Sequence, residues 1–242
     1  MRQKSSQDID KPGTRPGERV PLGEDYFCSR EQVDRYHTLS ESPMRYLVTN
    51  FVRRVQKKKV GPGCVLDIGS GTGRFLLSLG KKLSHQNKLI GIDISREMVK
   101  KALEEVKKSN SINLPEFHAA SADCLPFRDA AFDLIISSYS LHQWAHPERV
   151  FNEVHRVLNK GGAFLIRDGK RPPPTLFWRF LLGIASKMTG LNNWQRLNWY
   201  KAVEACYTVD EIKDILEHSQ FTSWKVYSDL VFFELCIEGT KT

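Results

Sequence analysis

A glycine-rich turn after a short apolar run holds the residues best suited to bind a ligand. Asp67 precedes Gly69, Gly71 and Gly73, which occupy every second position. Glycines at such spacing allow a tight turn and a close approach between backbone and ligand. A dinucleotide-binding turn would read Gly-x-Gly-x-x-Gly, and Arg74 stands where its third glycine belongs. The turn therefore favours a ligand with cationic and hydroxyl groups over a pyrophosphate.

Three further polar positions follow predicted strands along the chain. Asp93, next to Ile94, ends the second predicted strand, where a doubly wound sheet faces the ribose of a nucleoside ligand. A carboxylate there can accept hydrogen bonds from both ribose hydroxyls. Asp123 lies in the loop after the third strand, where it can accept a hydrogen bond from the amino group of an adenine. Ser138 ends the fourth strand, at the carboxyl edge where open α/β sheets bind ligands.

The elements that must position these residues alternate between strands and helices. Short apolar runs predict strands at 64–68, 88–94, 116–119, 132–138, 163–167, 223–228 and 230–237. Helical periodicity predicts helices at about 42–60, 74–83, 96–106, 147–158 and 209–218. Alternation of this kind predicts an α/β, Rossmann-like, doubly wound fold with a mostly parallel seven-stranded sheet. The last two strands are joined too closely for a crossover, so we expect an antiparallel last strand.

These motifs, in this order, resemble the class I S-adenosylmethionine-dependent methyltransferases. More narrowly, they resemble the branch that methylates small molecules, including the ubiquinone and menaquinone biosynthesis C-methyltransferases. The phrases that carry the resemblance are Val-Leu-Asp-Ile-Gly-Ser-Gly-Thr-Gly-Arg, Gly-Ile-Asp-Ile-Ser-Arg-Glu-Met-Val, Leu-Pro-Phe-Arg-Asp-Ala-Ala-Phe-Asp, Ser-Leu-His-Gln-Trp and Glu-Val-His-Arg-Val-Leu-Asn-Lys-Gly-Gly. The resemblance covers residues 40–170 and implies S-adenosyl-L-methionine as the cofactor.

The resemblance also implies which residues bind that cofactor. They are Asp67, Gly69, Ser70, Gly71, Gly73, Asp93, Ile94, Asp123, Cys124 and Ser138. Asp67 and the glycines after it would shape the pocket for the methionine moiety, and Asp93 would bind ribose. Asp123 and Cys124 would lie beside adenine. The backbone near Ser138 would hold the methionine end.

The catalytic step needs alignment more than proton transfer. Methyl transfer from a sulfonium is an in-line displacement, so alignment of the acceptor supplies much of the catalysis. A general base is needed only when the acceptor must lose a proton. His142 follows the fourth strand by a few residues and is the candidate base, because an imidazole can take up a proton at neutral pH. The alternative is that His142 only packs there; Tyr139, Asp168 and His37 are weaker candidates.

Two patterns argue against particular subclasses. The fourth strand is followed by Ser-Ser-Tyr-Ser, whereas methyltransferases of nucleic-acid or glutamine amino groups carry Asn/Asp-Pro-Pro-Tyr/Phe there. The five cysteines, at 28, 64, 124, 206 and 236, are scattered and form no Cys-x-x-Cys pair. We therefore expect no metal site and no disulfide framework, and the set does not resemble that of arsenite methyltransferases.

The chain is expected to form one domain, 25–242, after a flexible tail, 1–24. Within the domain we expect cap helices at 25–60, a cofactor-binding core at 61–168, an insert at 169–203 and a C-terminal helix with strands at 204–242. The insert is rich in bases and aromatic residues and has no acidic residue. It fits a lid over an apolar or anionic acceptor, a membrane-contacting face at 176–200, or a structural cap.

Charge and composition leave several partners open. Most of the net charge of +8 lies in the first 60 residues. A small-molecule acceptor is favoured, a nucleic-acid or protein acceptor is the alternative, and an inactive cofactor-binding module is a third reading. The sequence predicts neither a secretory signal nor a membrane-spanning helix, and we expect a cytoplasmic protein. It does not indicate the oligomeric state.

Overall fold

The computed structural model describes residues 19–21, 29–39, 44–58, 63–83, 86–175, 183–184, 193–229 and 234–242. Its helices are α1 (Arg30–Leu39), α2 (Met44–Lys57), α3 (Arg74–Gly80), α4 (Arg96–Lys107), α5 (Pro147–Val157), α7 (Asn193–Ala205), α8 (Val209–Glu217) and the short 3₁₀ helix η1 (Leu141–Gln143). Its strands are β1 (Cys64–Ile68), β2 (Lys88–Asp93), β3 (Glu116–Ala119), β4 (Phe132–Ser138), β5 (Leu158–Gly169), β6 (Ser223–Asp229) and β7 (Glu234–Thr240).

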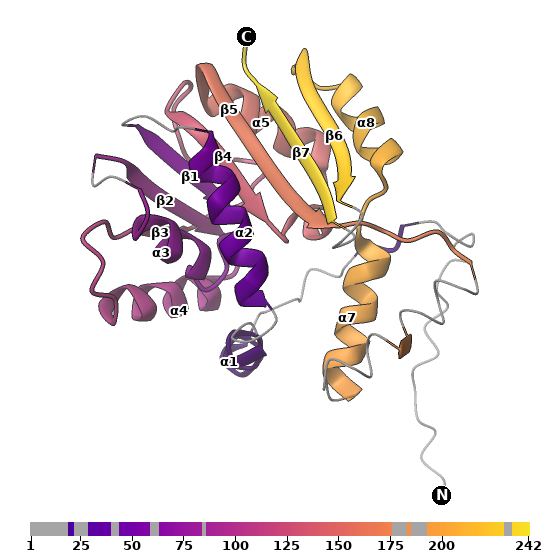
Figure 1. Ribbon diagram of the computed structural model, residues 1–242, viewed down its shortest axis with the longest axis horizontal. Coiled ribbons are helices and arrows are strands. Elements are labelled where there is room, and N and C mark those ends of the chain that lie inside the picture. The colour runs from indigo at the N-terminus through magenta and orange to yellow at the C-terminus, as the bar shows by residue number, and fades with distance from the viewer. Residues whose placement is uncertain are drawn as a thin grey trace, which may run out of the picture.

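The seven strands form one sheet in the order β3-β2-β1-β4-β5-β7-β6 (Figure 1). The pairs among β1 to β5 are parallel, and β7 runs antiparallel to both β5 and β6. This topology confirms the predicted Rossmann-like α/β fold with its antiparallel last strand.

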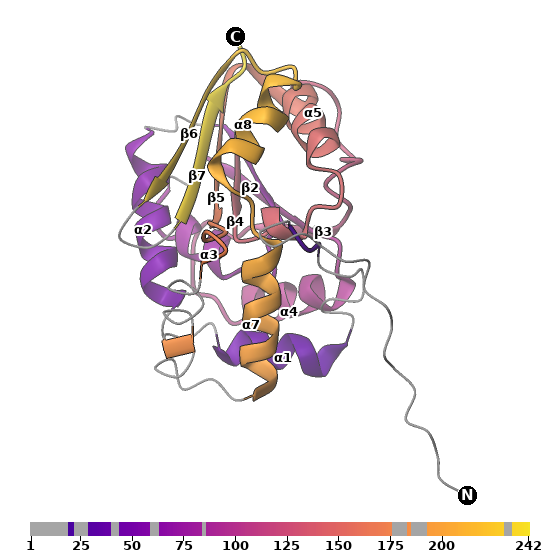
Figure 2. The same cartoon turned by 90° about the vertical axis from the view of Figure 1, so that its right-hand side faces the viewer.

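Helices cover both faces of the sheet (Figure 2). Side chains of α2, α3 and α4 join one apolar cluster, and those of α5 and α8 join another. Adjacent residues of β1 belong to different clusters: Val65 lies in the first and Leu66 in the second. Successive side chains of a strand point to opposite faces, so a short apolar run of this kind needs cover on both sides.

Two strands and one helix illustrate how the structure differs from the predictions. β5 begins at Leu158, not at the predicted residue 163, because Leu158 pairs with Phe132; the register then shifts, with extra residues in β5 before Ala163 pairs with Leu134. β7 continues to Thr240 because that residue pairs with both neighbouring strands, and positions 230–233 of the predicted strand lie outside the described residues. The helix α7, within the expected insert, was not predicted as a helix.

Two helices, α1 and α7, lie beyond the carboxyl ends of the parallel strands (Figure 1). α1 is tied to α4 by ion pairs, with both Arg30 Nη atoms 2.7 Å from the Glu104 carboxylate and Lys101 Nζ 3.0 Å from Asp34. Val33, also on α1, is fully buried. The helix is thereby held where its residues can reach the edge of the sheet at which ligands bind in such folds.

Residues 19–21 belong to the segment expected to be a tail, yet they contact the rest of the domain. Arg19 stacks on the ring of Tyr207, 4.1 Å from its centroid, and the Val20 amide donates to the Glu204 carbonyl. No helix in the described part of the chain is both long and apolar enough to cross a membrane.

Candidate active site

A cavity of about 880 Å³ opens at the carboxyl ends of β1, β2 and β4. Its volume lies within the usual range for small-molecule sites. The predicted residues that line it are Asp67, Gly69, Ser70, Gly71, Asp93, Ile94, Asp123 and Ser138. The structure thus brings three carboxylates and the glycine-rich turn, which are separated in the chain, to one place.

Asp93 holds the glycine-rich turn in position. Its Oδ2 accepts a hydrogen bond from the Gly71 amide at 2.8 Å, and its Oδ1 accepts one from the Ser95 amide at 2.9 Å. The amides of Gly69 and Ser70 both donate to the Ile92 carbonyl of β2. These bonds extend the pairing of β1 with β2 into the turn. Burial raises the pKa of the Asp93 carboxyl, although the two backbone bonds oppose that rise.

Asp67, at the end of β1, is the most buried of the three acids. It is 2% exposed, and its Oδ1 has no hydrogen-bond partner in the described protein; the same is true of Ser70 Oγ nearby. Burial and the charge of Asp93 raise the pKa of the Asp67 carboxyl well above its usual value. A buried acceptor without a partner is costly, so an ammonium or hydroxyl donor in the cavity would relieve the cost. These orphaned atoms fit the methionine end of S-adenosylmethionine.

The nucleoside part of the cavity combines polar and apolar groups. Ile94 lines the cavity and still exposes 75% of its surface, which suits contact with a planar base. Asp123 also lines it, with its Oδ1 accepting a hydrogen bond from Ser121 Oγ. Together with Asp93 these residues fit an adenosine.

Two predicted cofactor residues are not among the described residues that line the cavity. Cys124 is exposed beside it. Gly73 begins α3 with a φ of 77°, and an added Cβ would lie 2.6 Å from Phe117 Cζ, so the structure gives this glycine a packing task.

Several residues that the sequence did not indicate as cofactor contacts also line the cavity. Tyr36 reaches the cavity from α1, and Gln143 and Trp144 reach it from the η1 turn. Trp144 is fixed by a hydrogen bond from its Nε1 to Ser140 Oγ at 3.1 Å. Gln143 and Trp144 belong to the phrase Ser-Leu-His-Gln-Trp, so the sequence motif could have indicated them. Tyr36 could be placed only by the docking of a separate helix.

Tyr139, a weaker candidate base, lines the cavity with an unusual backbone. Its φ of 57° lies in the left-handed region that non-glycine residues seldom adopt, which is common at functional sites. Its hydroxyl donates to the buried Glu234 carboxylate, and burial raises its pKa. Removing that proton is therefore unfavourable, which argues against Tyr139 as a base. His37 lies against α4, with its Nε2 3.7 Å from Glu105, rather than in the cavity.

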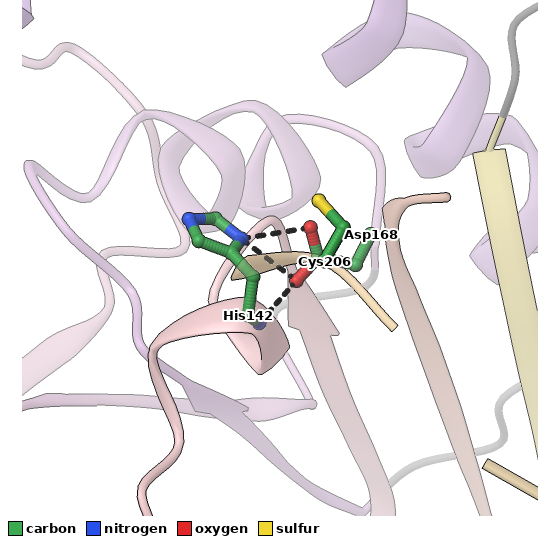
Figure 3. Close-up of side chains that lie close together, drawn as sticks. All are labelled: His142, Asp168 and Cys206. Carbon is green, nitrogen blue, oxygen red and sulfur yellow. Dashed lines mark hydrogen bonds and ion pairs between the residues drawn. The ribbon is translucent and has the colours of Figure 1, made fainter. Parts of the chain in front are cut away.

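His142 and Asp168 form a buried pair next to the cavity (Figure 3). His142 Nδ1 lies 2.8 Å from Asp168 Oδ1 and 3.0 Å from Oδ2, and the His142 amide donates to Oδ2 at 2.8 Å. A carboxylate at Nδ1 favours the tautomer whose Nε2 is unprotonated and basic. That Nε2 lies 3.5 Å from the side-chain amide of Gln143, a cavity residue. The candidate base is thus one side chain away from the cavity.

Cys206 completes a group that has the ligand types of a metal site. Its Sγ, an oxygen of Asp168 and a ring nitrogen of His142 lie within 4.8 Å of one another. The Asp168 oxygens already accept from two backbone amides, including that of Gly169, and from the imidazole. Burial also raises the pKa of the Cys206 thiol, which keeps it protonated and a poor ligand. The geometry therefore favours a hydrogen-bonded dyad over a metal centre.

Comparison with known proteins places this site in a family. The family described as "Methyltransferase domain" matches residues 63–220, well over half of the chain. The chain belongs to this family of class I S-adenosylmethionine-dependent methyltransferases. The match contains the glycine-rich turn, all three cavity carboxylates and the His142–Asp168 pair.

Curated relatives of this methyltransferase-family chain include enzymes with different acceptors. An arsenite methyltransferase of Halobacterium salinarum is 29% identical over 168 residues, which cover 69% of this chain and 39% of the relative. A ubiquinone/menaquinone biosynthesis C-methyltransferase of Escherichia fergusonii is 31% identical over 108 residues, 45% of this chain and 43% of the relative. The chain thus spans less than half the length of these two relatives.

Solved structures share the fold. A putative S-adenosyl-L-methionine-dependent methyltransferase from Methanococcus maripaludis has a TM-score of 0.71 at 18% identity, over 92% of this chain and 97% of its own. The plantazolicin methyltransferase BpumL, in complex with SAH, has a TM-score of 0.68 at 16% identity, over 90% and 93%.

The cavity assignment can be tested by adding a methyl group to the turn. Gly71 and Gly161 both have positive φ, 54° and 78°, and an added Cβ meets nothing within 4 Å in either case. Gly71→Ala and Gly161→Ala should therefore destabilise the protein similarly, by about 1–2 kcal/mol. Only Gly71→Ala should weaken binding of S-adenosylhomocysteine in calorimetry, by tenfold or more (about 1.4 kcal/mol). Equal affinity of the two variants would contradict the assignment.

The buried Asp67 carboxylate should destabilise the free protein at neutral pH. Its raised pKa means that the folded state disfavours the ionised form, so its contribution to stability is lost as the pH rises above the usual carboxyl pKa. Asp67→Asn should therefore raise the free energy of unfolding at pH 7, by about 1–3 kcal/mol, and change it little below about pH 4. Urea denaturation without ligand measures this. A variant that is less stable than the parent at both pH values would refute the interpretation.

Proposed function

We propose that the chain transfers a methyl group from S-adenosylmethionine to a small molecule whose reacting atom must lose a proton. The observation that carries the proposal is the placement of the His142–Asp168 dyad directly behind the wall of a cavity that fits the cofactor. When bound, the cofactor supplies a methyl group already activated on a sulfonium. The protein then has to bind, align and deprotonate.

The cofactor would be held by groups that the sheet brings together. Asp93 would accept from the ribose hydroxyls with lone pairs not used by its two backbone donors. Asp67 and Ser70 would receive the polar methionine end, and Ile94 with Asp123 would contact adenine. The open space at Gly71 would allow the ligand to approach the backbone.

His142 would act as the general base through Nε2. Asp168 holds Nδ1 and the backbone amide of the same residue, which fixes both the tautomer and the orientation of the ring. Because Gln143 stands between Nε2 and the cavity, the side chain of Gln143 would move aside or relay the contact as the acceptor binds. Transfer of the proton to Nε2 would leave an imidazolium stabilised by Asp168.

The acceptor would be apolar in the part that enters the cavity. Tyr139, Trp144, Val48 and Phe75 supply much of the lining near the η1 turn and α2. Arg171, a base of the 169–203 insert, binds the Glu211 carboxylate and the Cys206 carbonyl and is 8% exposed. Arg171 is thereby engaged within the protein, and the aromatic and aliphatic lining supports an apolar acceptor.

The acceptor class is tested by supplying methyl-labelled S-adenosylmethionine and a cell extract. Label should enter the lipid or small-metabolite fraction. Label in RNA or protein instead would replace the small-molecule proposal with the macromolecular one. Binding of S-adenosylhomocysteine without label in any fraction would favour an inactive binding module.

The dyad is tested in the fraction that takes up label. His142→Gln and Asp168→Asn should lower the rate about 10²–10⁴-fold and leave the affinity for S-adenosylhomocysteine within twofold. His218→Gln is the matched control, because that exposed histidine hydrogen-bonds the Asp214 carbonyl far from the cavity. An undiminished rate for folded His142→Gln would exclude the base.

A further inference from the structure

One arginine from the N-terminal segment grips the turn that carries the proposed base. Arg19 Nη2 donates to the carbonyl oxygens of His142 at 3.0 Å and Trp144 at 3.5 Å. Arg19 Nε donates to the Ala205 carbonyl at 2.8 Å, and the guanidinium stacks 4.1 Å over the ring of Tyr207. A single side chain therefore joins three segments that are far apart in the chain.

The contacts around this guanidinium reinforce one another. The Val20 amide donates to the Glu204 carbonyl at 3.2 Å, which places the backbone beside Arg19 against the end of α7. The Tyr207 hydroxyl donates to the same Trp144 carbonyl at 3.4 Å. The turn is thus held by both members of the Arg19–Tyr207 stack. A cation on an aromatic face adds attraction to these hydrogen bonds.

The carbonyls that Arg19 binds are those that a short turn leaves open. Within η1, the Trp144 amide returns to Leu141 and the Gln143 amide to Ser140, whereas the His142 and Trp144 carbonyls point outward to Arg19. Buried carbonyls need donors, and a guanidinium offers five in a fixed plane. A lysine could not reproduce that fork.

His142 is consequently fixed from both sides. Asp168 holds its amide and its ring, and Arg19 holds its carbonyl. Without Arg19 the turn would be free to rotate the peptide at His142, and the ring would lose its alignment with Asp168. A misplaced base costs rate even when the fold persists.

We propose that Arg19 is a positioning residue for His142, and that it connects the proposed base to the end of α7, the helix that closes the 169–203 insert. The proposal rests on the proposed function of His142 as a base. Arg19 is not among the described residues that line the cavity, so it would act through the turn and not on the ligands.

The test reads the imidazole directly and needs no methyl acceptor. Nitrogen-15 spectra of the imidazoles, recorded on the full chain with S-adenosylhomocysteine, should show His142 as one tautomer protonated at Nδ1, with the signal assigned by its loss in His142→Gln. In Arg19→Ala the Nδ1 proton should exchange with water at least about tenfold faster, and the nitrogen shifts should move toward a tautomer average. Arg19→Lys should change them in the same direction by less.

Lys241→Ala is the matched control. Lys241 Nζ also donates to two backbone carbonyls, those of His155 at 2.8 Å and Leu158 at 2.9 Å, but at the opposite end of the sheet. It should lower stability comparably and leave the His142 signature unchanged. Should Arg19→Ala fail to fold, Arg19→Lys carries the test.

The outcomes separate the two proposals. A parental His142 signature in folded Arg19→Ala or Arg19→Lys would overturn the positioning role. So would an equal change in Lys241→Ala, because the effect would then be one of stability alone. If the signature depends on Arg19 but no fraction of the extract takes up label, only the proposed function fails.

Discussion

One carboxylate, that of Asp93, sets the geometry on which the rest of the site depends. Its two oxygens accept hydrogen bonds from backbone amides of two separate loops. One amide is that of Gly71, after β1, and the other is that of Ser95, before α4. The glycine-rich turn and the start of α4 are thereby locked to the end of β2. Because these bonds already fix the carboxylate, which lines the cavity, it could bind hydroxyl groups there without further ordering.

The site places its polar groups at a cost to the fold. Asp67 keeps an oxygen without a partner in the described protein, and Tyr139 keeps a strained backbone. Asp168, by contrast, is fully supplied with donors. A ligand could supply the missing donor to Asp67, whereas the bonds of Asp168 hold the His142 side chain rigid. This division matches a cavity that binds a ligand and a dyad that acts on one.

Much of the fold was predictable because its signals are local. Short apolar runs marked the buried parallel strands, and the helix predicted from residue 96 does begin at Arg96, where Ser95 caps it by accepting a hydrogen bond from the Met98 amide. The acids of the cavity were found because each follows a strand, and parallel strands end at one edge. Their tasks in cofactor binding stay predictions.

What could not be predicted depends on contacts between distant segments. Tyr36 enters the cavity only because the ion pairs of α1 with α4 place that helix. Asp168 lies 26 residues from His142, and Arg19 lies 123 residues from it. Neither the periodicity nor the spacing of residues in the sequence indicates that His142 contacts Asp168 or Arg19. The close packing of Gly73 against Phe117 is likewise a contact between distant segments that a motif does not show.

Calorimetric titration of S-adenosylhomocysteine into the parent chain and into Asp93→Ala tests the central claim most directly. The account predicts saturable binding to the parent and a loss of affinity of about a hundredfold or more in the variant, since charge-assisted hydrogen bonds and the lock on the turn are removed together. Absence of binding to the parent, or equal binding by a folded Asp93→Ala, would contradict it.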